Sequence, residues 1–545
     1  MSDPGTTTRD VRAGLARSSA AVATGTLLSR LTGLLRVGAL AWAVGGGSLA
    51  DAYNLANTTP NIVYELLLGG ILAATIVPIF VRHAEAHDER STSAVFTVTL
   101  TVLTGFTLVA MACTPLIARL FSINTSGPER AAQLHVITVL TLCFLPQMVF
   151  YGLTALETAV LNAHRRFVAA AYAPVLNNVV VIGVLAVFAS RTAHGRTWTD
   201  ATRLRSEGGL LLLLGLGTTA GIIAMALVLV PAVRRARIHL RPVFAWRDAG
   251  VRTMVRLSGW TLGYVATNQI AQLFVLVLAK TGDSGDVTAY VYAFTFYVLP
   301  YGLLAVSLMT TMTPELARRA ASGDRHGLRR DFNMGLRYLI VLVLPASVLF
   351  AVLAQPIVGV LTVGGRFSEH SAHVTGDALQ LFALSLVPFS VYLYAMRGFY
   401  ALHDTRTPFV LNSAENAVNV GLALALFPWL GVQGLALAWS VAYGVSAFSA
   451  LARLRRRIGQ VPDTGVRAAT ARAVLGAIAL AIVGIPLAGA IGSRSAGRAV
   501  VATGVAATAG ALAYLAVLSL LRSDELGAIV GIVRRRTKAS ADVSP

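Results

Sequence analysis

The chain has little charge for its length. Asp, Glu, Lys and Arg make up only 13% of its 545 residues, against about 25% in a soluble globular protein, while 55% are hydrophobic. So few charges cannot cover a soluble surface of this size, and the composition predicts a polytopic membrane protein. Acidic residues are scarcest, with 25 against 45 Lys and Arg. The basic residues lie in short loops between apolar spans, which is a topology signal and not the mark of a nucleic-acid partner.

Cysteine is nearly absent, and so are catalytic motifs. Cys113 and Cys143 lie in separate apolar spans without a CxxC or metal-binding pattern, so we expect small core residues and no metal site. The sequence contains no phosphate-binding P-loop, no HExxH and no recognisable Ser/His/Asp arrangement. Nothing in it indicates ATP hydrolysis or chemistry on a substrate. Transport without a cofactor is therefore the expected activity, and an enzyme is not.

Long apolar stretches predict an all-α protein that crosses the membrane fourteen times. The expected spans are 19–48, 52–81, 92–118, 132–162, 167–189, 208–233, 253–279, 287–316, 335–363, 374–402, 408–428, 431–452, 469–492 and 497–521. Most Lys and Arg residues fall in the two termini and in every second loop, such as 234–241, 317–330 and 453–457. The positive-inside rule then predicts that both termini lie in the cytoplasm.

Two segments of the sequence recur at an offset of about 240 residues. Residues 155–188 resemble 395–427, and the region around Pro60 resembles the region around Pro300. An offset of six helices keeps the orientation, so this is a parallel repeat, although chance similarity among Ala/Leu/Val-rich helices is the alternative. The predicted parts are a cytoplasmic N-terminal segment (1–18), an N-lobe of six helices (19–235), a basic cytoplasmic linker (236–252), a C-lobe of six helices (253–457), helices 13 and 14 (458–521) and a basic cytoplasmic tail (522–545).

Two arginines lie inside the first apolar span. An arginine at bilayer depth costs at least about 2.5–3.5 kcal/mol, so Arg30 and Arg36 must face water, a counter-charge or an anionic ligand. Arg36 has the alternative of extending to the far membrane interface. The two side chains are about 120° apart on a straight helix, so a bend near Gly33 or a large ligand is needed to bring them to one point.

A polar stripe follows on the second span. Asp51, Asn54, Thr58, Asn61 and Glu65 fall within an arc of about 80°, although Pro60 will bend the helix. Such a stripe faces protein or water and not lipid. Hydrogen bonding between helices is the alternative for the two asparagines. The two carboxylates favour a wet cavity and are the expected partners of the arginines in the first span.

Two further groups of polar residues lie in the second half. Asn412, Asn416 and Asn419 share a helix face beside Glu415, an arrangement that predicts either a small-cation site coordinated by Asn412 and Asn416 or hydrogen bonds to neighbouring helices. Arg397, near the end of span 10, is a candidate for substrate binding. Its alternatives are extension to the interface or an ion pair with Asp404.

Five motifs taken together resemble the MurJ/MviN family of lipid II flippases, within the MOP exporter superfamily. They are SRLTGLLR (29–36), DAYNLANTTPN (51–61), VLNAHRRF with APVLNN (160–178), LPYGLLAVSLMTTMTPELA (299–317) and GFYALHDTRTP (398–408). The resemblance covers about residues 19–520, and the Ala/Arg/Val-rich composition is similar to that of an actinobacterial member.

The resemblance implies a substrate and a site. The substrate is undecaprenyl-diphosphate-linked muropeptide, carried across the bacterial plasma membrane by alternating access between two lobes, with the polyprenyl tail in a groove formed with helices 13 and 14. Membrane potential or a Na+ gradient would drive it, and membrane lipids and cell-wall synthesis and division proteins would be its neighbours. The resemblance assigns head-group binding to Arg30 and Arg36. The polar patterns described above add Asp51, Asn54, Asn61, Glu65 and Arg397 as candidate substrate-binding residues.

The sequence departs from the better-known family pattern at several positions. Val37 stands where an acidic residue commonly follows the second arginine, and Tyr64 and Glu65 replace a pair of arginines. Thr295 replaces a further cavity arginine, whereas Asp51 is retained. The resemblance to a strongly cationic cavity is therefore partial.

Three other functions compete with lipid II transport. A MATE-like drug/cation antiporter would need an acidic site, for which Glu65, Glu157 and Glu415 are candidates. A flippase for another polyprenyl-diphosphate glycan is a close relative of the leading hypothesis. A scaffold for cell-wall enzymes that transports nothing would tolerate charge reversal at Arg30 and Arg36.

Overall fold

Helices make up the regular structure of the chain in our computed structural model, and the part it describes contains no strand. The described residues are 4–65, 77–86, 88–122, 127–164, 166–192, 200–236, 238, 240–248, 250–252, 259–362, 364–491 and 496–527. Eleven helices there are long and apolar enough to cross a membrane, and the bent pair α18 (Glu369–Ala383) and α19 (Leu386–Ala401) makes a twelfth candidate. The predicted all-helical, multi-span architecture is thereby confirmed.

Several helices begin at an aspartate whose side chain forms the N-cap. Asp88 accepts the Ser91 N–H at the start of α4 (Glu89–Ala112), and Asp324 accepts the Gly327 N–H at the start of α16 (Arg325–Val352). These side chains satisfy backbone donors that have no partner within the helix. The ends of the spans are therefore fixed by short polar residues in the loops.

Contacts divide the chain into two compact units. Unit 1 comprises residues 1–288 with Gly365–Phe367, and unit 2 comprises 289–364 and 368–545. The helices of unit 1 are α1 (Pro4–Val44), α2 (Ser48–Tyr64), α3 (Val77–Glu85), α4, α5 (Thr114–Leu120), α6 (Gly127–Phe144), α7 (Gln147–Ala163), α8 (Val168–Arg191), α9 (Ala201–Leu204), α10 (Gly208–Leu227), α11 (Val230–Arg235), α13 (Gly259–Lys280) and the first turn of α14 (Asp286–Pro300). The repeat boundary expected at 236–252 stays a prediction.

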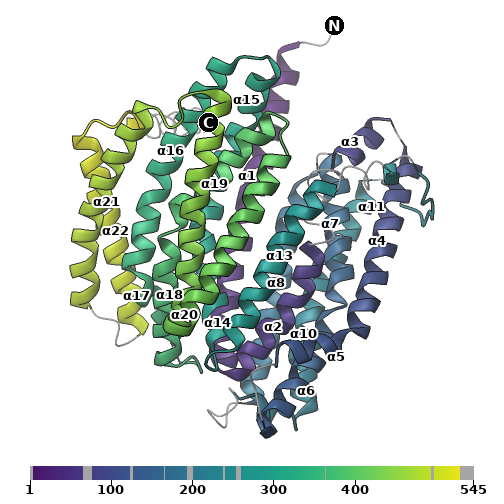
Figure 1. The fold of residues 1–545 in the computed structure, drawn as a ribbon. Coiled ribbons are helices and arrows are strands. Elements are labelled where there is room, and N and C mark those ends of the chain that lie inside the picture. Colours follow the sequence, from purple (N-terminus) through teal and green to yellow (C-terminus); the bar gives the residue numbers. More distant parts are fainter. Residues whose placement is uncertain are drawn as a thin grey trace. The chain divides into compact units, whose positions relative to one another are not determined.

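Small residues bring the helices of unit 1 together. A Cβ atom on Gly25 of α1 would lie 2.8 Å from the Tyr172 ring on α8, and one on Gly217 of α10 would lie 2.6 Å from Val184 on α8. Close approach through glycine is the usual way in which membrane helices associate, because lipid supplies no hydrophobic force between them. Helix α8 thus packs against both α1 and α10 (Figure 1).

An arginine from a loop caps two helix ends of unit 1. The Arg366 guanidinium donates to the Ala43 carbonyl at the end of α1 (2.7 Å) and to the carbonyl and hydroxyl of Thr192 after α8 (both 2.6 Å). Terminal carbonyls have no partner inside a helix and attract cations. Burial lowers the pKa of Arg366 from its usual range, but the carbonyls at both helix ends give the charge a favourable site.

Unit 2 contains the second half of the chain. Its elements are most of α14, a π-turn (η3, Tyr301–Ala305), α15 (Val306–Ala321), α16, α17 (Ala354–Gly359), η4 (Val360–Thr362), α18, α19, α20 (Arg406–Ile458), α21 (Thr464–Ile491) and α22 (Ala496–Leu520). Aromatic side chains fill the space between α14, α18, α19 and α20. They include Tyr290, Phe294, Tyr297, Phe382, Phe389 and Trp439.

Helix α20 is two helices and not one. A straight helix of its 53 residues would be about 80 Å long, well over twice the hydrocarbon core. The backbone leaves the helical region at Gly431 (φ 53°, ψ −135°), and a Cβ on Gly434 would lie 2.7 Å from the Leu426 carbonyl oxygen. The chain therefore turns back on itself, where the sequence predicts separate spans at 408–428 and 431–452. The predicted span 52–81 covers α2, α3 and residues 66–76 between them. Residues 66–76 lie outside the described chain.

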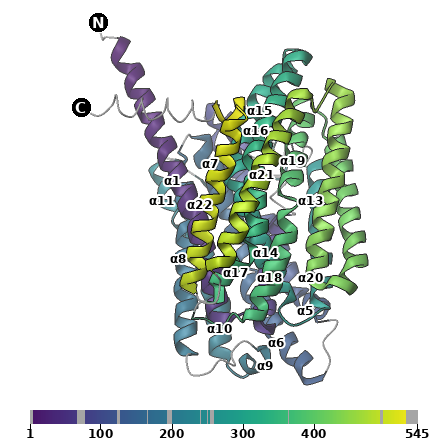
Figure 2. The ribbon, with the colours of Figure 1, turned by 90° about the vertical axis from the view of Figure 1, so that its left-hand side faces the viewer.

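The last two spans pack as a pair against α16 (Figure 2). The Tyr514 ring of α22 lies on Gly476 of α21, and its hydroxyl donates to the Val341 carbonyl of α16 at 2.7 Å. A polar clamp holds the segment that follows α22. The Glu525 carboxylate, 1% exposed, accepts from Arg337 Nε at 2.7 Å and from the Ser523 hydroxyl at 2.7 Å. Burial opposes ionisation, but these hydrogen bonds hold the pKa of Glu525 below its usual value.

Candidate functional site

One face of α1 carries Arg36 toward the interior of unit 1. Asn178 of α8 donates to the Ser29 carbonyl at 3.2 Å and to the Thr32 hydroxyl at 3.0 Å, so this face of α1 contacts α8. Arg36 is seven residues after Ser29 and within about 20° of it around the helix. Its guanidinium interacts electrostatically with the phenols of Tyr53 on α2 and Tyr151 on α7. The half-buried Arg36 thus lies where α1, α2 and α7 present polar groups.

Arg30 lies on another face of the same helix. Its side chain is exposed, and within the described chain it makes no hydrogen bond or ion pair. The angle of about 120° between the two arginines persists, because α1 continues as a helix through Gly33. With the two arginines on different faces of an unbroken helix, a ligand that contacts both guanidinium groups must be large.

Asp51 is the most constrained member of the polar stripe. It is fully buried, and its carboxylate accepts the Gly285 N–H at 2.8 Å, the Thr288 N–H at 2.9 Å and the Thr288 hydroxyl at 2.7 Å. These donors belong to the first turn of α14, whose own N-cap position is a glycine without a side chain. Asp51 therefore serves as the N-cap of a helix that follows it by more than two hundred residues.

Lys280 and Gly285 complete the environment of this carboxylate. The Lys280 ammonium at the end of α13 lies 3.9 Å from Asp51 Oδ2 and is 10% exposed. Gly285 has a φ of +105°, and a Cβ there would lie 2.2 Å from the Gly46 carbonyl oxygen. A residue with a side chain is excluded at this turn by both conformation and space. Lys280, Gly285 and Thr288 were not expected from the sequence, where nothing links them to span 2.

The rest of the stripe becomes more exposed along α2. Asn54, 6% exposed, donates to the Thr288 hydroxyl at 3.1 Å, whereas the half-buried Asn61 donates to the Asn57 carbonyl of its own helix. Glu65 at the end of the helix is exposed. The expected pairing of Asp51 with the arginines of α1 is wrong, because Lys280 and the turn before α14 occupy its oxygens. Within the described residues Glu65 forms no ion pair with Arg30 or Arg36 either.

The asparagine group of α20 is deeply buried in unit 2. Asn412, Glu415, Asn416 and Asn419 are between 1% and 7% exposed. Asn416 donates to the Asn412 carbonyl at 2.9 Å, and Glu415 Oε1 has no hydrogen-bond partner among the described residues. The Glu415 carboxyl lies close enough to Tyr290 and Tyr297 to interact with both phenols. Amide and carboxyl oxygens are suitable ligands for a small cation.

Arg397 of α19 forms no hydrogen bond or ion pair with Asp404 in the described chain. It is exposed and interacts electrostatically with Tyr301 and Tyr400. Asp404 instead accepts the N–H and hydroxyl of Thr407, at 2.9 and 2.7 Å, and lies 3.5 Å from Arg457. The ion-pair alternative for Arg397 is therefore wrong, because other donors already fill the Asp404 carboxylate.

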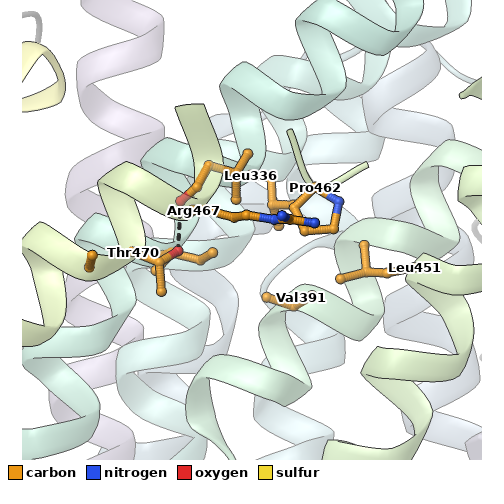
Figure 3. A pocket seen from close by; sticks show the side chains of 9 residues that line it. Leu336, Val391, Leu451, Pro462, Arg467 and Thr470 are labelled. Carbon is orange, nitrogen blue, oxygen red and sulfur yellow. Dashed lines mark hydrogen bonds between the residues drawn. The ribbon is translucent and has the colours of Figure 1, made fainter. Parts of the chain in front are cut away.

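A cavity of about 430 Å³ lies between α16, α19, α20 and α21 in unit 2 (Figure 3). Its walls are apolar, with Leu336, Val391 and Leu451 among them. The Arg467 side chain extends across it toward Pro462. The Thr470 hydroxyl donates a hydrogen bond to the Val466 carbonyl of its own helix. The guanidinium is thus the polar group that this cavity offers.

Comparisons with known proteins agree over nearly the whole chain. The model of the family described as "Lipid II flippase MurJ" matches residues 40–496. A probable lipid II flippase MurJ of Rhizobium meliloti is 32% identical over 97% of both chains. The corresponding protein of Haemophilus influenzae is 28% identical over 78% of this chain and 83% of its own.

Solved structures show the same fold. A structure titled "Lipid II flippase MurJ, inward closed conformation" superposes with a TM-score of 0.73 at 21% identity, over 92% of this chain and 99% of its own. An inward-facing multidrug resistance MATE family transporter of the MOP superfamily gives a TM-score of 0.63 at 16% identity, over 78% and 94%. At these identities the structures speak for the fold alone.

Proposed function

The chain belongs to the lipid II flippase MurJ family and is a membrane transporter, not an enzyme, and we propose that it carries lipid II from the inner to the outer leaflet by alternating access. The family match carries this conclusion. In this function the protein supplies the outer surface with the precursor for cell-wall synthesis. The protein would be resident in the bacterial plasma membrane.

The α1 arginines are the proposed ligands of the diphosphate. Arginine presents a planar pair of donors to phosphate oxygens. Arg30 has no protein partner within the described chain, and Arg36 lies beside two phenols that can orient it. A lipid-linked diphosphate with its sugar and peptide is large enough to contact two guanidinium groups on different faces of one helix.

Because the sequence departs from the family pattern at other cationic positions, these two arginines are the main candidates for binding the diphosphate. Thr295 donates to the Val291 carbonyl of its own helix at 2.8 Å and carries no charge. Glu65 adds a negative charge where the pattern has a positive one. We therefore assign the main cationic contacts to Arg30 and Arg36, with a secondary contact at Arg397. Asn54, Asn61 and Glu65 would contact the sugar or peptide, and Asp51 would support α14.

Our proposed topology has fourteen spans with both termini in the cytoplasm, arranged as two six-helix lobes and two added helices. The turn at Gly431 supports counting α20 as two spans. The concentration of arginine in alternate loops supports the orientation. Cell-wall synthesis and division proteins are the expected partners on either side.

We also propose that a Na+ ion binds at Asn412 and Asn416, with Glu415 as the charged ligand, and couples transport to the cation gradient. The buried Glu415 oxygen without a hydrogen-bond partner in the described chain supports this. Transport in vesicles should then require external Na+ in the wild type and should lose that dependence in Glu415→Gln. Equal transport with Na+ and with choline would assign the driving force to membrane potential.

Complementation of a flippase-depleted strain tests the main proposal. Wild type should restore growth and expose lipid II to an externally added binding probe, whereas Arg30→Ala and Arg36→Ala should restore neither. Arg119→Ala, an exposed arginine in α5, is the matched control and should behave as wild type. Full rescue by both α1 variants would refute their roles, and unchanged lipid II exposure on depletion of the protein would refute the function.

A MATE-like cation antiporter is the weaker second candidate. The fold is shared, and the buried carboxyl of Glu157 has an oxygen without a hydrogen-bond partner among the described residues. Efflux of cationic dyes that is abolished by Glu157→Gln would favour it. Export of a different polyprenyl-diphosphate glycan would appear instead as wild-type lipid II exposure in a strain whose surface polysaccharide is lost.

A further inference from the structure

Two adjoining cavities lie on the outer side of α4, away from the residues assigned to transport. The first, about 640 Å³, is mainly apolar and is lined by Phe96, Leu100, Gly105 and Leu108 of α4 and by Phe244. The second, about 670 Å³, shares Phe244 and is lined by Arg90, Ser91, Trp246 and Arg247. Both volumes are within the range of about 300–1,000 Å³ typical of ligand sites. We call this pair of cavities the α4 groove.

The groove exists because the segment after α11 is attached along α4. The Arg241 N–H donates to the Ser93 hydroxyl at 3.2 Å, and the Val243 N–H donates to the Thr97 hydroxyl at 3.1 Å. Ser93 and Thr97 are one helical turn apart, and the alternate position is Pro242, which has no N–H to leave unsatisfied. The extended segment therefore forms one wall of the groove and contributes Phe244 to its lining.

The carboxylates at the polar end are occupied by the protein. Asp88 accepts the Ser91 N–H at 2.9 Å, and this hydrogen bond lowers the pKa of Asp88 below its usual value. Asp248 accepts the Ser91 hydroxyl at 3.1 Å and the Gly250 N–H at 2.8 Å. Arg90 and Arg247 are exposed, and their guanidinium groups form no hydrogen bond or ion pair with the described residues. The unused charge at this end is therefore positive.

The groove has the polarity of the membrane interface. Helix α4 is a candidate span, so its apolar cavity faces the hydrocarbon region. Phe244 and Trp246 are 67% and 52% exposed beside the arginines. Aromatic residues next to basic ones are typical of the level where headgroups meet acyl chains. The apolar cavity therefore lies where a lipid's acyl chain would be, and the arginines lie where its phosphate would be.

We propose that the α4 groove binds an anionic phospholipid of the surrounding membrane, with one acyl chain along Phe96–Leu108 and the phosphate at Arg90 and Arg247. Charge complementarity selects this occupant, since arginines without partners attract anionic headgroups. The site is separate from Arg30 and Arg36, and the lipid is retained and not transported. It would hold residues 240–248 against α4.

Lipid retention by the purified full-length protein tests this proposal. In detergent, wild type should be stabilised against heat by phosphatidylglycerol and much less by phosphatidylcholine, and native mass spectrometry should detect a retained phosphatidylglycerol. Arg90→Ala with Arg247→Ala should weaken phosphatidylglycerol binding about 30-fold, because each basic residue at an anionic surface contributes a factor of roughly five. Both side chains are exposed, so this variant should fold.

Two glycine substitutions distinguish filling of the groove from general destabilisation of the fold. A Cβ on Gly105 meets nothing within 4 Å, so Gly105→Leu should fill the apolar cavity without a clash and abolish phosphatidylglycerol retention. Gly183→Leu on α8, which is equally open, should retain the lipid as wild type does. Retention by Gly105→Leu, equal stabilisation by phosphatidylcholine, or recovery of lipid II in place of phosphatidylglycerol would each overturn the proposal.

Discussion

Replacing Asp51 with alanine should destabilise the fold before it affects transport. The carboxylate is 0% exposed and accepts three hydrogen bonds from Gly285 and Thr288, and Lys280 lies 3.9 Å away. Alanine leaves two backbone N–H groups without an acceptor and a nearly buried ammonium without its counter-charge. The first turn of α14 and the end of α13 lose their common anchor.

The size of the effect follows from these groups. Removing one partner of a buried ion pair costs about 3–5 kcal/mol, and this range includes much of the cost of the unsatisfied N–H groups, since such losses are not additive. Asp51→Asn keeps one acceptor oxygen but loses the charge and turns an NH2 group toward one of the two backbone N–H donors, so roughly 1–3 kcal/mol is expected. Adding Lys280→Met to Asp51→Asn removes the unpaired ammonium and should recover part of that loss.

Thermal unfolding of the detergent-purified protein measures these differences. The midpoint should fall most for Asp51→Ala, less for Asp51→Asn, and least for the double variant. Asn61→Ala is the matched control, because Asn61 lies in the same stripe and bonds only its own helix. An unchanged midpoint in Asp51→Ala, combined with loss of lipid II exposure in cells, would refute the capping role and make Asp51 a substrate ligand.

Three further predictions concern other parts of the fold. Arg366→Ala should lower stability by roughly 1.5–3 kcal/mol, measured as a lower unfolding midpoint, because the carbonyls ending α1 and α8 lose a charged donor; an unchanged midpoint would contradict this. Glu525→Gln should increase protease cleavage of the segment after α22. Asp524→Asn should not, because the Asp524 side chain is already 83% exposed. Because the pKa of Glu525 is lowered in the folded state, its contribution is present above the ordinary pKa near 4.5 and is lost as pH falls below it, so acid should increase cleavage of wild type and leave Glu525→Gln unaffected. Gly434→Leu should cost about 1–3 kcal/mol or more by overpacking against a backbone carbonyl, while Gly444→Leu in the same helix, where a Cβ meets nothing within 4 Å, should unfold at the wild-type temperature.

The sequence predicts the helical spans well because their signal is local. Twenty apolar residues in a row are sufficient to predict a membrane helix, and the spans expected at 132–162 and 167–189 coincide with candidates at Arg130–Ala163 and Val168–Arg191. The turn at Gly431 was also visible, as a break between two apolar stretches. The face of α2 that carries polar groups follows directly from the helical period.

The partners of the polar groups were not predictable, because they are set by tertiary contacts. Asp51 and Glu65 were paired with the α1 arginines on charge alone, but Lys280 and the α14 turn take Asp51 in the folded chain. No pattern in the sequence singles out Arg366, because its partners are the carbonyls that end α1 and α8. The open space beside Gly105 likewise depends on a segment more than a hundred residues later.

The large sequence separation between Asp51 and its hydrogen-bond donors has a consequence for synthesis of the protein in the membrane. Its hydrogen bonds to Gly285 and Thr288 span 234 and 237 residues. At a translation rate of roughly 5–20 residues per second, α2 exists for roughly 10–50 seconds before its partner emerges from the ribosome. During that interval a carboxylate destined for the interior has no donor from its own chain. Residues 1–288 can therefore reach their native packing only after α14 has begun to insert, and truncation ahead of α14 should yield a half-protein that is rapidly degraded.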